Sequence, residues 1–220
     1  MRPRHLIFDC DGVLVDSEPL SMAVDVEILR EAGVTMSAAE AHRRFVGKTF
    51  AAMIAEITRE FGAKFPADVS ADKDRRLLKI YEKALKPVPG MAAALGEIGG
   101  KPSVASNSPA QRVREALRLT GLTPFFEDRI VTFEHVKHGK PEPDVFIEAA
   151  ARAGAPPSSC IVVEDSITGV TAAFRAGCRV LGFTGTHLHP EHHAKALTAA
   201  GAPLTFHEMS RLAAVLQLIA

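Results

Sequence analysis

The sequence predicts an α/β protein with a Rossmann-like doubly wound parallel sheet and an inserted α-helical cap domain. Three observations predict this class: short apolar runs typical of buried strands, helical stretches between most of them, and one long insertion without strands. Because apolar residues fill the runs without alternating with polar ones, both faces of the sheet are expected to be covered by helices. The expected strands are His5–Phe8, Ser103–Ser106, Arg129–Thr132, Cys160–Glu164, Arg179–Phe183 and Leu204–Phe206.

Helices are expected between the later strands. Pro109 precedes the first of them and a glycine follows each one, which is the usual order of these residues around helices. In a doubly wound sheet, ligands bind at the carboxyl ends of the strands, so the residues that follow the strands are the first candidates for a site. The three helices are Gln111–Thr120, Asp144–Ala153 and Ile167–Ala176.

The insertion lies between Pro19 and Leu85, where no convincing strand occurs. We therefore predict two domains, a core of residues 1–16 and 87–220 and a helical cap of residues 17–86. Because the insertion leaves the core directly after the first strand, it is expected to overhang the site as a lid. Helical spacing of apolar residues marks Leu20–Glu31, Ala38–Phe45, Ala51–Phe61 and Ala71–Leu85.

The composition favours a packed, cytoplasmic protein. Hydrophobic residues make up 47% of the chain, and its 26 basic residues balance 26 acidic ones, so neither nucleic acid nor a membrane surface is an expected partner. No apolar run approaches the roughly 18 residues of a membrane helix. Three cysteines without CxxC spacing argue against a disulfide framework. We expect a monomer.

Four carboxylates follow strands that share one edge of the sheet. Asp9 and Asp11 come after the first strand, and Glu164 and Asp165 come at the end of the fourth. Such a group repels itself unless a cation neutralises it, and oxygen ligands favour a hard ion such as Mg²⁺. We predict a Mg²⁺ site that uses all four residues.

The other strand ends offer groups that suit a phosphate. Lys140 precedes an expected helix and can balance the charge of a phosphoryl group. Ser106 and Asn107 follow the second strand and can donate hydrogen bonds to phosphoryl oxygens, with help from loop amides. These three residues form the predicted phosphate-binding site.

The arrangement predicts phosphoryl transfer through a covalent intermediate. We assign Asp9 as the nucleophile that forms an aspartyl-phosphate and Asp11 as the general acid and base. Each motif alone has a simpler explanation: Ser106 as a strand-end cap, Lys140 as a solvated turn residue, Glu164 and Asp165 as caps of the next helix. Their joint occurrence at the right strand ends favours catalysis.

The ordered motifs identify the sequence as similar to the haloacid dehalogenase superfamily. They are DCDGVLVDSE from Asp9 to Glu18, Ser106 with Asn107, GKPEPDVF around Lys140, and VVEDS around Glu164 and Asp165. The resemblance is to the helical-cap branch with beta-phosphoglucomutase-like and phosphoglycolate-phosphatase-like proteins. It implies Mg²⁺ held by Asp9, the main-chain carbonyl of Asp11, and Asp165, with Glu164 in support, and a cap that opens and closes.

The same resemblance leaves phosphatase and mutase to be distinguished. Val46 and Phe50 stand where beta-phosphoglucomutases carry a basic pair for a second phosphate, which favours a phosphatase acting on a small phosphorylated metabolite, such as a sugar phosphate. A phosphomutase is the alternative, and a non-catalytic phospho-ligand binding protein a remote one. Lys48, Thr49 and Lys73 are the candidate substrate residues of the cap.

A histidine-rich segment, Thr186 to His193, follows the fifth strand. We interpret it as a surface loop, because its spacing matches no common metal site. A transition-metal site and a contact with substrate are the alternatives.

Overall fold

The structure, a computed structural model, describes residues 5–45 and 49–219. The chain forms two compact units. One comprises Met1–Asp16 and Lys86–Ala220 and holds the sheet, and the other, Ser17–Leu85, is helical.

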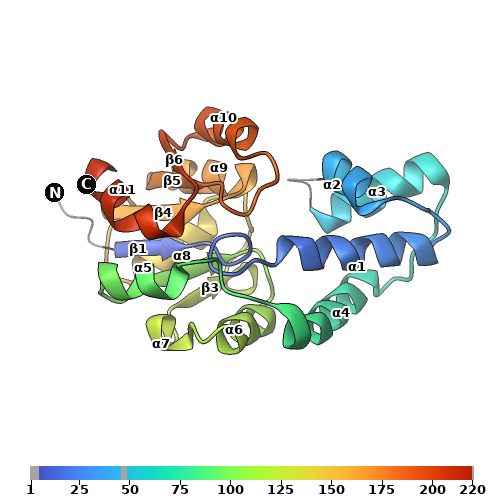
Figure 1. The fold of residues 1–220 in the computed structure, drawn as a ribbon, viewed down its shortest axis with the longest axis horizontal. Coiled ribbons are helices and arrows are strands. Elements are labelled where there is room, and N and C mark those ends of the chain that lie inside the picture. Colours follow the sequence, from blue (N-terminus) through green and yellow to red (C-terminus); the bar gives the residue numbers. More distant parts are fainter. Residues whose placement is uncertain (1–4, 46–48, 220) are drawn as a thin grey trace. The chain divides into compact units, whose positions relative to one another are not determined.

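In the part of the chain that the structure describes, the sheet unit contains six parallel strands in the order β3-β2-β1-β4-β5-β6 (Figure 1). This order places β1 at the centre, with β2 on one side and β4 on the other, as in Rossmann-like folds. The predicted fold class is therefore confirmed. The strands are β1 (His5–Phe8), β2 (Ser103–Ser106), β3 (Ile130–Thr132), β4 (Cys160–Glu164), β5 (Arg179–Phe183) and β6 (Leu204–Phe206).

Helices connect these strands, and the three predicted ones end within one residue of their expected positions. The histidine-rich segment differs from the expected loop, because Pro190 begins a helix there; proline suits a first helical turn. The helices of this unit are α5 (Met91–Ile98), α6 (Ala110–Leu119), α7 (Thr123–Phe126), α8 (Asp144–Arg152), α9 (Ile167–Arg175), α10 (Pro190–Ala200) and α11 (Leu212–Ile219), with 3-10 turns η1 (Phe133–His135), η2 (Pro157–Ser159) and η3 (Met209–Arg211).

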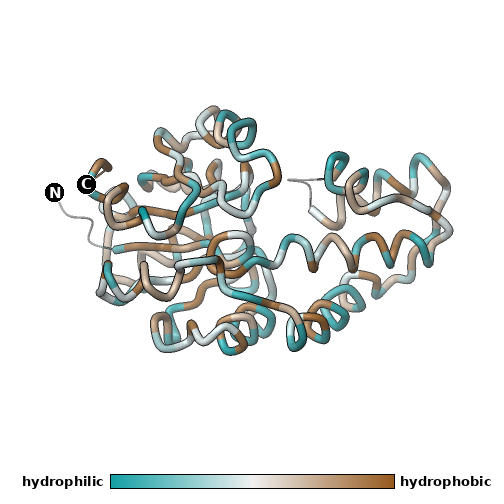
Figure 2. The backbone as a smooth tube through the Cα atoms, in the orientation of Figure 1, coloured by the Kyte–Doolittle hydropathy of each residue, from teal (hydrophilic) through white to brown (hydrophobic). Residues whose placement is uncertain are grey.

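Both faces of the sheet are packed. On one face, Ile7 of β1 lies in a buried cluster with residues of α8, α9 and α10, including Phe146, Val170 and Leu197. The next residue, Phe8, points to the other face, where its ring meets that of Phe126 in α7. Figure 2 shows the hydrophobic character of β1, which suits a strand with a neighbour on each side.

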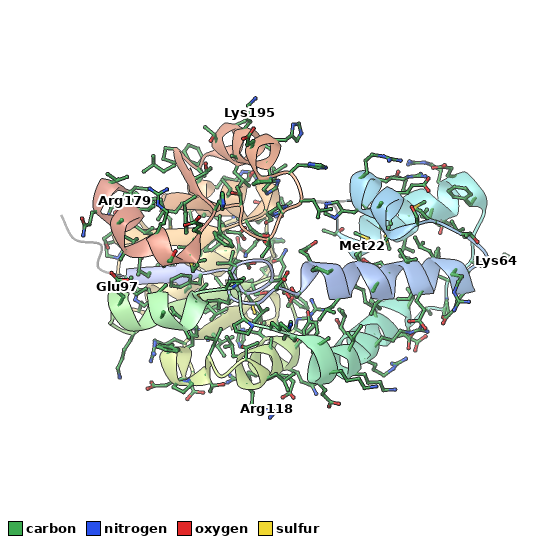
Figure 3. All side chains as sticks on the ribbon, viewed as in Figure 1. Met22, Lys64, Glu97, Arg118, Arg179 and Lys195 are labelled. Carbon is green, nitrogen blue, oxygen red and sulfur yellow. The ribbon has the colours of Figure 1, made fainter. Side chains whose placement is uncertain are left out.

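Charged side chains of this unit mostly point outward. Figure 3 labels three of them on the helices, Glu97, Arg118 and Lys195, and all three are exposed. Buried charged residues are therefore exceptional, and among its described residues the sheet unit has four: Asp9, Lys140, Glu164 and Asp165. Among the described residues, no helix has the length and hydropathy to cross a membrane.

The helical unit has its own apolar core, in which Leu29, Phe45, Met53 and Ile57 are buried. Helices α1 and α4 pack against each other. Its helices are α1 (Glu18–Glu31), α2 (Ala38–Phe45), α3 (Phe50–Phe61) and α4 (Val69–Ala84), close to the predicted spans.

Candidate active site

The register of the sheet brings the predicted site residues to one edge. Phe8 pairs with Val163 of β4 and with Val104 of β2. The backbone N–H of Asp9 continues this pairing by donating to the carbonyl of Val163 at 3.0 Å. Asp9 therefore lies between the ends of β2 and β4, beside Glu164.

Lys140 joins these strand ends. Its Nζ donates to Oδ1 of Asp9 at 2.5 Å, to Oε1 of Glu164 at 2.7 Å and to the carbonyl of Ala105 at 2.9 Å. Only 3% of its side chain is exposed. All three donor positions of the ammonium are thus used, which compensates for removing the charge from water.

Asn107 holds the loop that carries Lys140. Its Oδ1 accepts from the backbone N–H of Lys140 at 2.8 Å, and its Nδ2 donates to the carbonyl of the same residue at 3.0 Å. A Cβ on Gly139 would lie 2.7 Å from Oδ1 of Asn107, so glycine is needed for this approach. The side chain of Asn107 thus positions the lysine loop with one of its two Nδ2 hydrogens, and its predicted donation to phosphate stays a prediction.

Ser106 and Ser108 follow the second strand, and both are buried. Oγ of Ser106 accepts from the backbone N–H of Ser108 at 3.0 Å. Ser108 Oγ donates to Oδ2 of Asp11 at 2.5 Å and accepts from Arg112, also at 2.5 Å. Sequence reasoning missed Ser108 and Arg112; the serine follows a strand end by two residues, which was the available signal.

Glu164 is completely buried and anchored by the loop that follows it. Its Oε2 accepts from the backbone N–H of Ser166 at 2.7 Å and from the hydroxyl of Ser166 at 3.0 Å. Ser166, rather than either acid, caps α9 by accepting from the N–H of Gly169. A Cβ on Gly169 would lie 1.6 Å from Oε1 of Glu164, so only glycine leaves room for this carboxylate.

Asp165 lies between the loop that carries Asp11 and Gly12 and the histidine-rich segment. Its Oδ2 is 3.1 Å from Nε2 of His187, and its main-chain oxygen is 2.5 Å from Nε2 of His193. The surface-loop interpretation is therefore wrong for these two histidines, because the pairing of β5 with β4 brings the segment after β5 beside Asp165.

Three carboxylates form a group with the spacing of a metal site. One oxygen each from Asp9, Glu164 and Asp165 lies within 4.8 Å of the others, and all three residues are buried. An all-oxygen donor set fits a hard divalent cation such as Mg²⁺. The side chain of Asp11 is outside this group, and its carboxylate accepts from Ser108 instead.

The electrostatics of the group favour the binding of a cation. Burial raises the pKa of Asp9 well above its usual range; Lys140 opposes this, but Glu164, Asp165 and Asp11 raise it further. Burial alone lowers the pKa of Lys140, but Asp9 and Glu164 outweigh it and the net direction is upward. Lys140 is therefore charged, and one ammonium faces four acids.

The candidate residues of the helical unit have structural partners where the structure describes them. Thr49 caps α3 by accepting from the N–H of Ala52. Nζ of Lys73 lies 2.6 Å from Oδ1 of Asp25 and 4.4 Å from the centre of the Phe50 ring. Lys48 and Val46 lie outside the described residues.

Comparison with known proteins assigns the family. Residues 3–177 match the family model of haloacid dehalogenase-like hydrolases, so the chain belongs to that family. The resemblance inferred from the sequence is confirmed, and so is the enzyme class, a phosphatase of the haloacid dehalogenase type.

Two relatives align with nearly the whole chain. A phosphorylated carbohydrates phosphatase of Thermotoga maritima is 31% identical over 206 residues, covering 90% of this chain and 91% of the relative. A 6-phosphogluconate phosphatase of Escherichia coli is 28% identical over 200 residues, covering 90% of each.

Similar solved structures support the same family assignment. A haloacid dehalogenase-like protein from Agrobacterium tumefaciens has 34% identity and a TM-score of 0.87, with 98% of both chains covered. A hydrolase of the family from Deinococcus radiodurans, solved with bound phosphate and sodium, has 30% identity and a TM-score of 0.78, covering 99% of this chain and 97% of that one.

Proposed function

We propose that this protein is a Mg²⁺-dependent phosphatase that hydrolyses a sugar phosphate or a similar small monoester through an aspartyl-phosphate on Asp9. The observation that carries the proposal is the buried ammonium of Lys140 between Asp9 and Glu164 at the carboxyl ends of β1, β2 and β4. A positive group buried beside a candidate nucleophile suits a dianionic phosphate.

Asp9 and Asp165 would hold the Mg²⁺ ion with Glu164 in support, since these are the acids whose oxygens lie together. When bound, the ion supplies positive charge that stabilises the transferring phosphoryl group and keeps Asp9 ionised. The main-chain carbonyl of Asp11, implied by the family resemblance, is a further ligand in this proposal.

Asp9 and Asp11 have different roles in the proposed reaction. A carboxylate oxygen of Asp9 attacks phosphorus while Asp11 gives a proton to the leaving alcohol oxygen. Asp11 next takes a proton from the water that attacks the aspartyl-phosphate, which releases inorganic phosphate and restores Asp9. The hydrogen bond from Ser108 orients the carboxyl group of Asp11 for both transfers.

The phosphate has two further partners in this proposal. The hydroxyl of Ser106 accepts from the backbone of Ser108, which leaves its hydrogen to be donated to a phosphoryl oxygen. Lys140 is held within the same site by the Asn107 side chain, so its charge is fixed in place before substrate binds. Such preorganisation favours the charge that develops during transfer.

The substrate class comes from the relatives. Two of them are named for phosphorylated carbohydrates and for 6-phosphogluconate, so we propose a sugar phosphate or sugar-acid phosphate for this enzyme. The helical unit, Ser17–Leu85, is proposed to act as the cap that selects the leaving group, since it is inserted five residues after Asp11. We also propose that the enzyme is a cytoplasmic monomer.

Phosphate release from a metabolite panel tests this function. Purified enzyme with Mg²⁺ is offered sugar phosphates, 6-phosphogluconate, phosphoglycolate and nucleotides. We expect the fastest release from sugar phosphates and none after chelation of Mg²⁺. Isomerisation of a sugar phosphate without release would support the mutase alternative, and binding without turnover would support a non-catalytic protein.

A further inference from the structure

The loop between β5 and α10 lies beside the acidic group. β5 pairs with β4 in parallel, with Glu164 opposite Gly182, so the segments that follow these two strands leave the sheet next to each other. A hydrogen bond of 2.9 Å from Thr186 Oγ1 to the carbonyl of Gly12 also ties this loop to the one that carries Asp11. The loop thus touches both acidic strand ends.

Two histidines of this segment hold Asp165 from one side. His187 contacts Oδ2 of its carboxylate, and His193 contacts its main-chain oxygen. The two imidazole rings stack with their centres 3.5 Å apart and an angle of 19° between their planes. The side chain of His187 is 10% exposed and that of Asp165 is 6% exposed, so the contact is largely shielded from water.

Gly12 also approaches the carboxylate of Asp165, at the same oxygen that His187 contacts. A Cβ at Gly12 would lie 2.1 Å from Oδ2 of Asp165, so the carboxylate rests directly against this glycine. Since an ionised carboxylate only accepts hydrogen bonds, His187 must donate from Nε2–H. The ring orientation that permits this is supported by the stacking on His193.

We infer that His187 is a positioning residue that donates to Oδ2 of Asp165 and thereby orients this carboxylate toward the divalent cation. The inference rests on the proposed Mg²⁺-dependent function. A donor behind a metal-binding carboxylate fixes its direction, and such partners influence metal affinity strongly. His193 contributes by holding the ring of His187 and the main chain of Asp165. Two other histidines of the segment, His189 and His192, are exposed and serve as comparisons.

Binding of Mn²⁺ to the substrate-free enzyme, followed by electron paramagnetic resonance, tests this role. His187→Phe keeps a ring that can stack but removes the donor, whereas His187→Gln keeps an N–H donor at a similar reach. We expect about tenfold weaker Mn²⁺ binding for His187→Phe, and binding within about twofold of wild type for His187→Gln. His192→Ala, the matched control, should bind as wild type does.

Kinetics give a second measurement. The Mg²⁺ concentration for half-maximal phosphate release should rise by about the same factor in His187→Phe, while the KM for substrate at saturating Mg²⁺ stays close to the wild-type value. His187→Ala removes the same donor and leaves a smaller side chain. It can replace His187→Phe in the measurement if the phenylalanine variant does not fold. A purely structural role would lower the thermal midpoint of both variants without changing Mn²⁺ affinity.

Three results would overturn the inference. They are wild-type Mn²⁺ affinity in both His187→Phe and His187→Ala, Mn²⁺ binding in His187→Gln as weak as in His187→Phe, or loss of folding in every variant that lacks the donor. A wild-type enzyme that binds no Mn²⁺ and releases no phosphate would instead contradict the proposed function itself. The two failures are therefore distinguishable.

Discussion

Nζ of Lys140 lies 2.5 Å from Oδ1 of Asp9, a residue 131 positions earlier in the chain. The same ammonium contacts Glu164, so one lysine holds together two carboxylates that would otherwise repel each other in a buried site. This contact links the stability of the sheet unit to its proposed chemistry.

Replacing Lys140 by Met should therefore destabilise the protein as well as inactivate it. Removing one partner from a buried ion pair leaves an uncompensated charge, and we expect a loss of about 3–5 kcal/mol in the free energy of unfolding, measured in urea with a chelator present. The exposed Lys137→Met should stay within about 0.5 kcal/mol of wild type. Equal stability of the two variants would show that Lys140 does not compensate the acids.

Gly169 should not tolerate even a methyl group. A Cβ there would meet Oε1 of Glu164 at 1.6 Å, so Gly169→Ala should displace this carboxylate, lower stability by roughly 1–3 kcal/mol and reduce phosphate release. Gly96→Ala, in α5 with nothing within 4 Å of the added Cβ, should raise stability by roughly 0.5–1 kcal/mol. If both variants gain stability, Glu164 is not confined as described.

Ser108→Ala should slow catalysis without unfolding the protein. The variant loses the donor 2.5 Å from Oδ2 of Asp11, and a hydrogen bond to a charged group is worth roughly 1.5–3 kcal/mol, so kcat should fall about tenfold to a hundredfold. Ser158→Ala, at an exposed position of η2, is the control; an unchanged kcat for Ser108→Ala would remove this residue from the mechanism.

His5 should make stability depend on pH at the start of β1. Its Nε2 is 2.7 Å from the hydroxyl of Ser103, and burial, with a smaller effect of Arg129, lowers the pKa of His5 below its ordinary value of 6.5. The unfolded chain therefore takes up a proton more readily than the folded one, so the stability contributed by neutral His5 is lost as the pH falls below 6.5. The free energy of unfolding, measured for wild type and His5→Gln, should fall more steeply in the wild type as the pH drops through this range. Parallel curves for the two proteins would contradict this prediction.

The strands and the main acidic residues could be predicted because they depend on local patterns. Unbroken apolar runs fixed the strand positions, and the parallel order that they imply brings Asp9 and Glu164 to one edge. The roles of Ser108 and His187 could not be predicted in the same way. The side chain of Ser108 reaches Asp11 across 97 positions, and His187 reaches Asp165 from the loop after β5, so both contacts depend on tertiary packing.

The side chain of Asn107 illustrates the same limit. Its position after β2 made it a candidate, but hydrogen-bonding capacity alone did not reveal that the side chain holds the backbone of Lys140. The candidate residues of the helical unit were the least predictable, because the partner of Lys73 is Asp25 on another helix, and residue type alone does not show which lysines are already paired.

Asp9 should become phosphorylated during turnover. Wild-type enzyme is mixed with Mg²⁺ and its best sugar-phosphate substrate, quenched in acid during the first turnovers, digested, and examined by peptide mass spectrometry. We predict a phosphoryl group on the peptide that contains Asp9, its absence in Asp9→Asn, and a fall in phosphate release of at least about 10³-fold in that variant. Two results would contradict this: phosphate release by the wild type with no phosphorylated peptide, or phosphate release by Asp9→Asn at a rate comparable to that of the wild type.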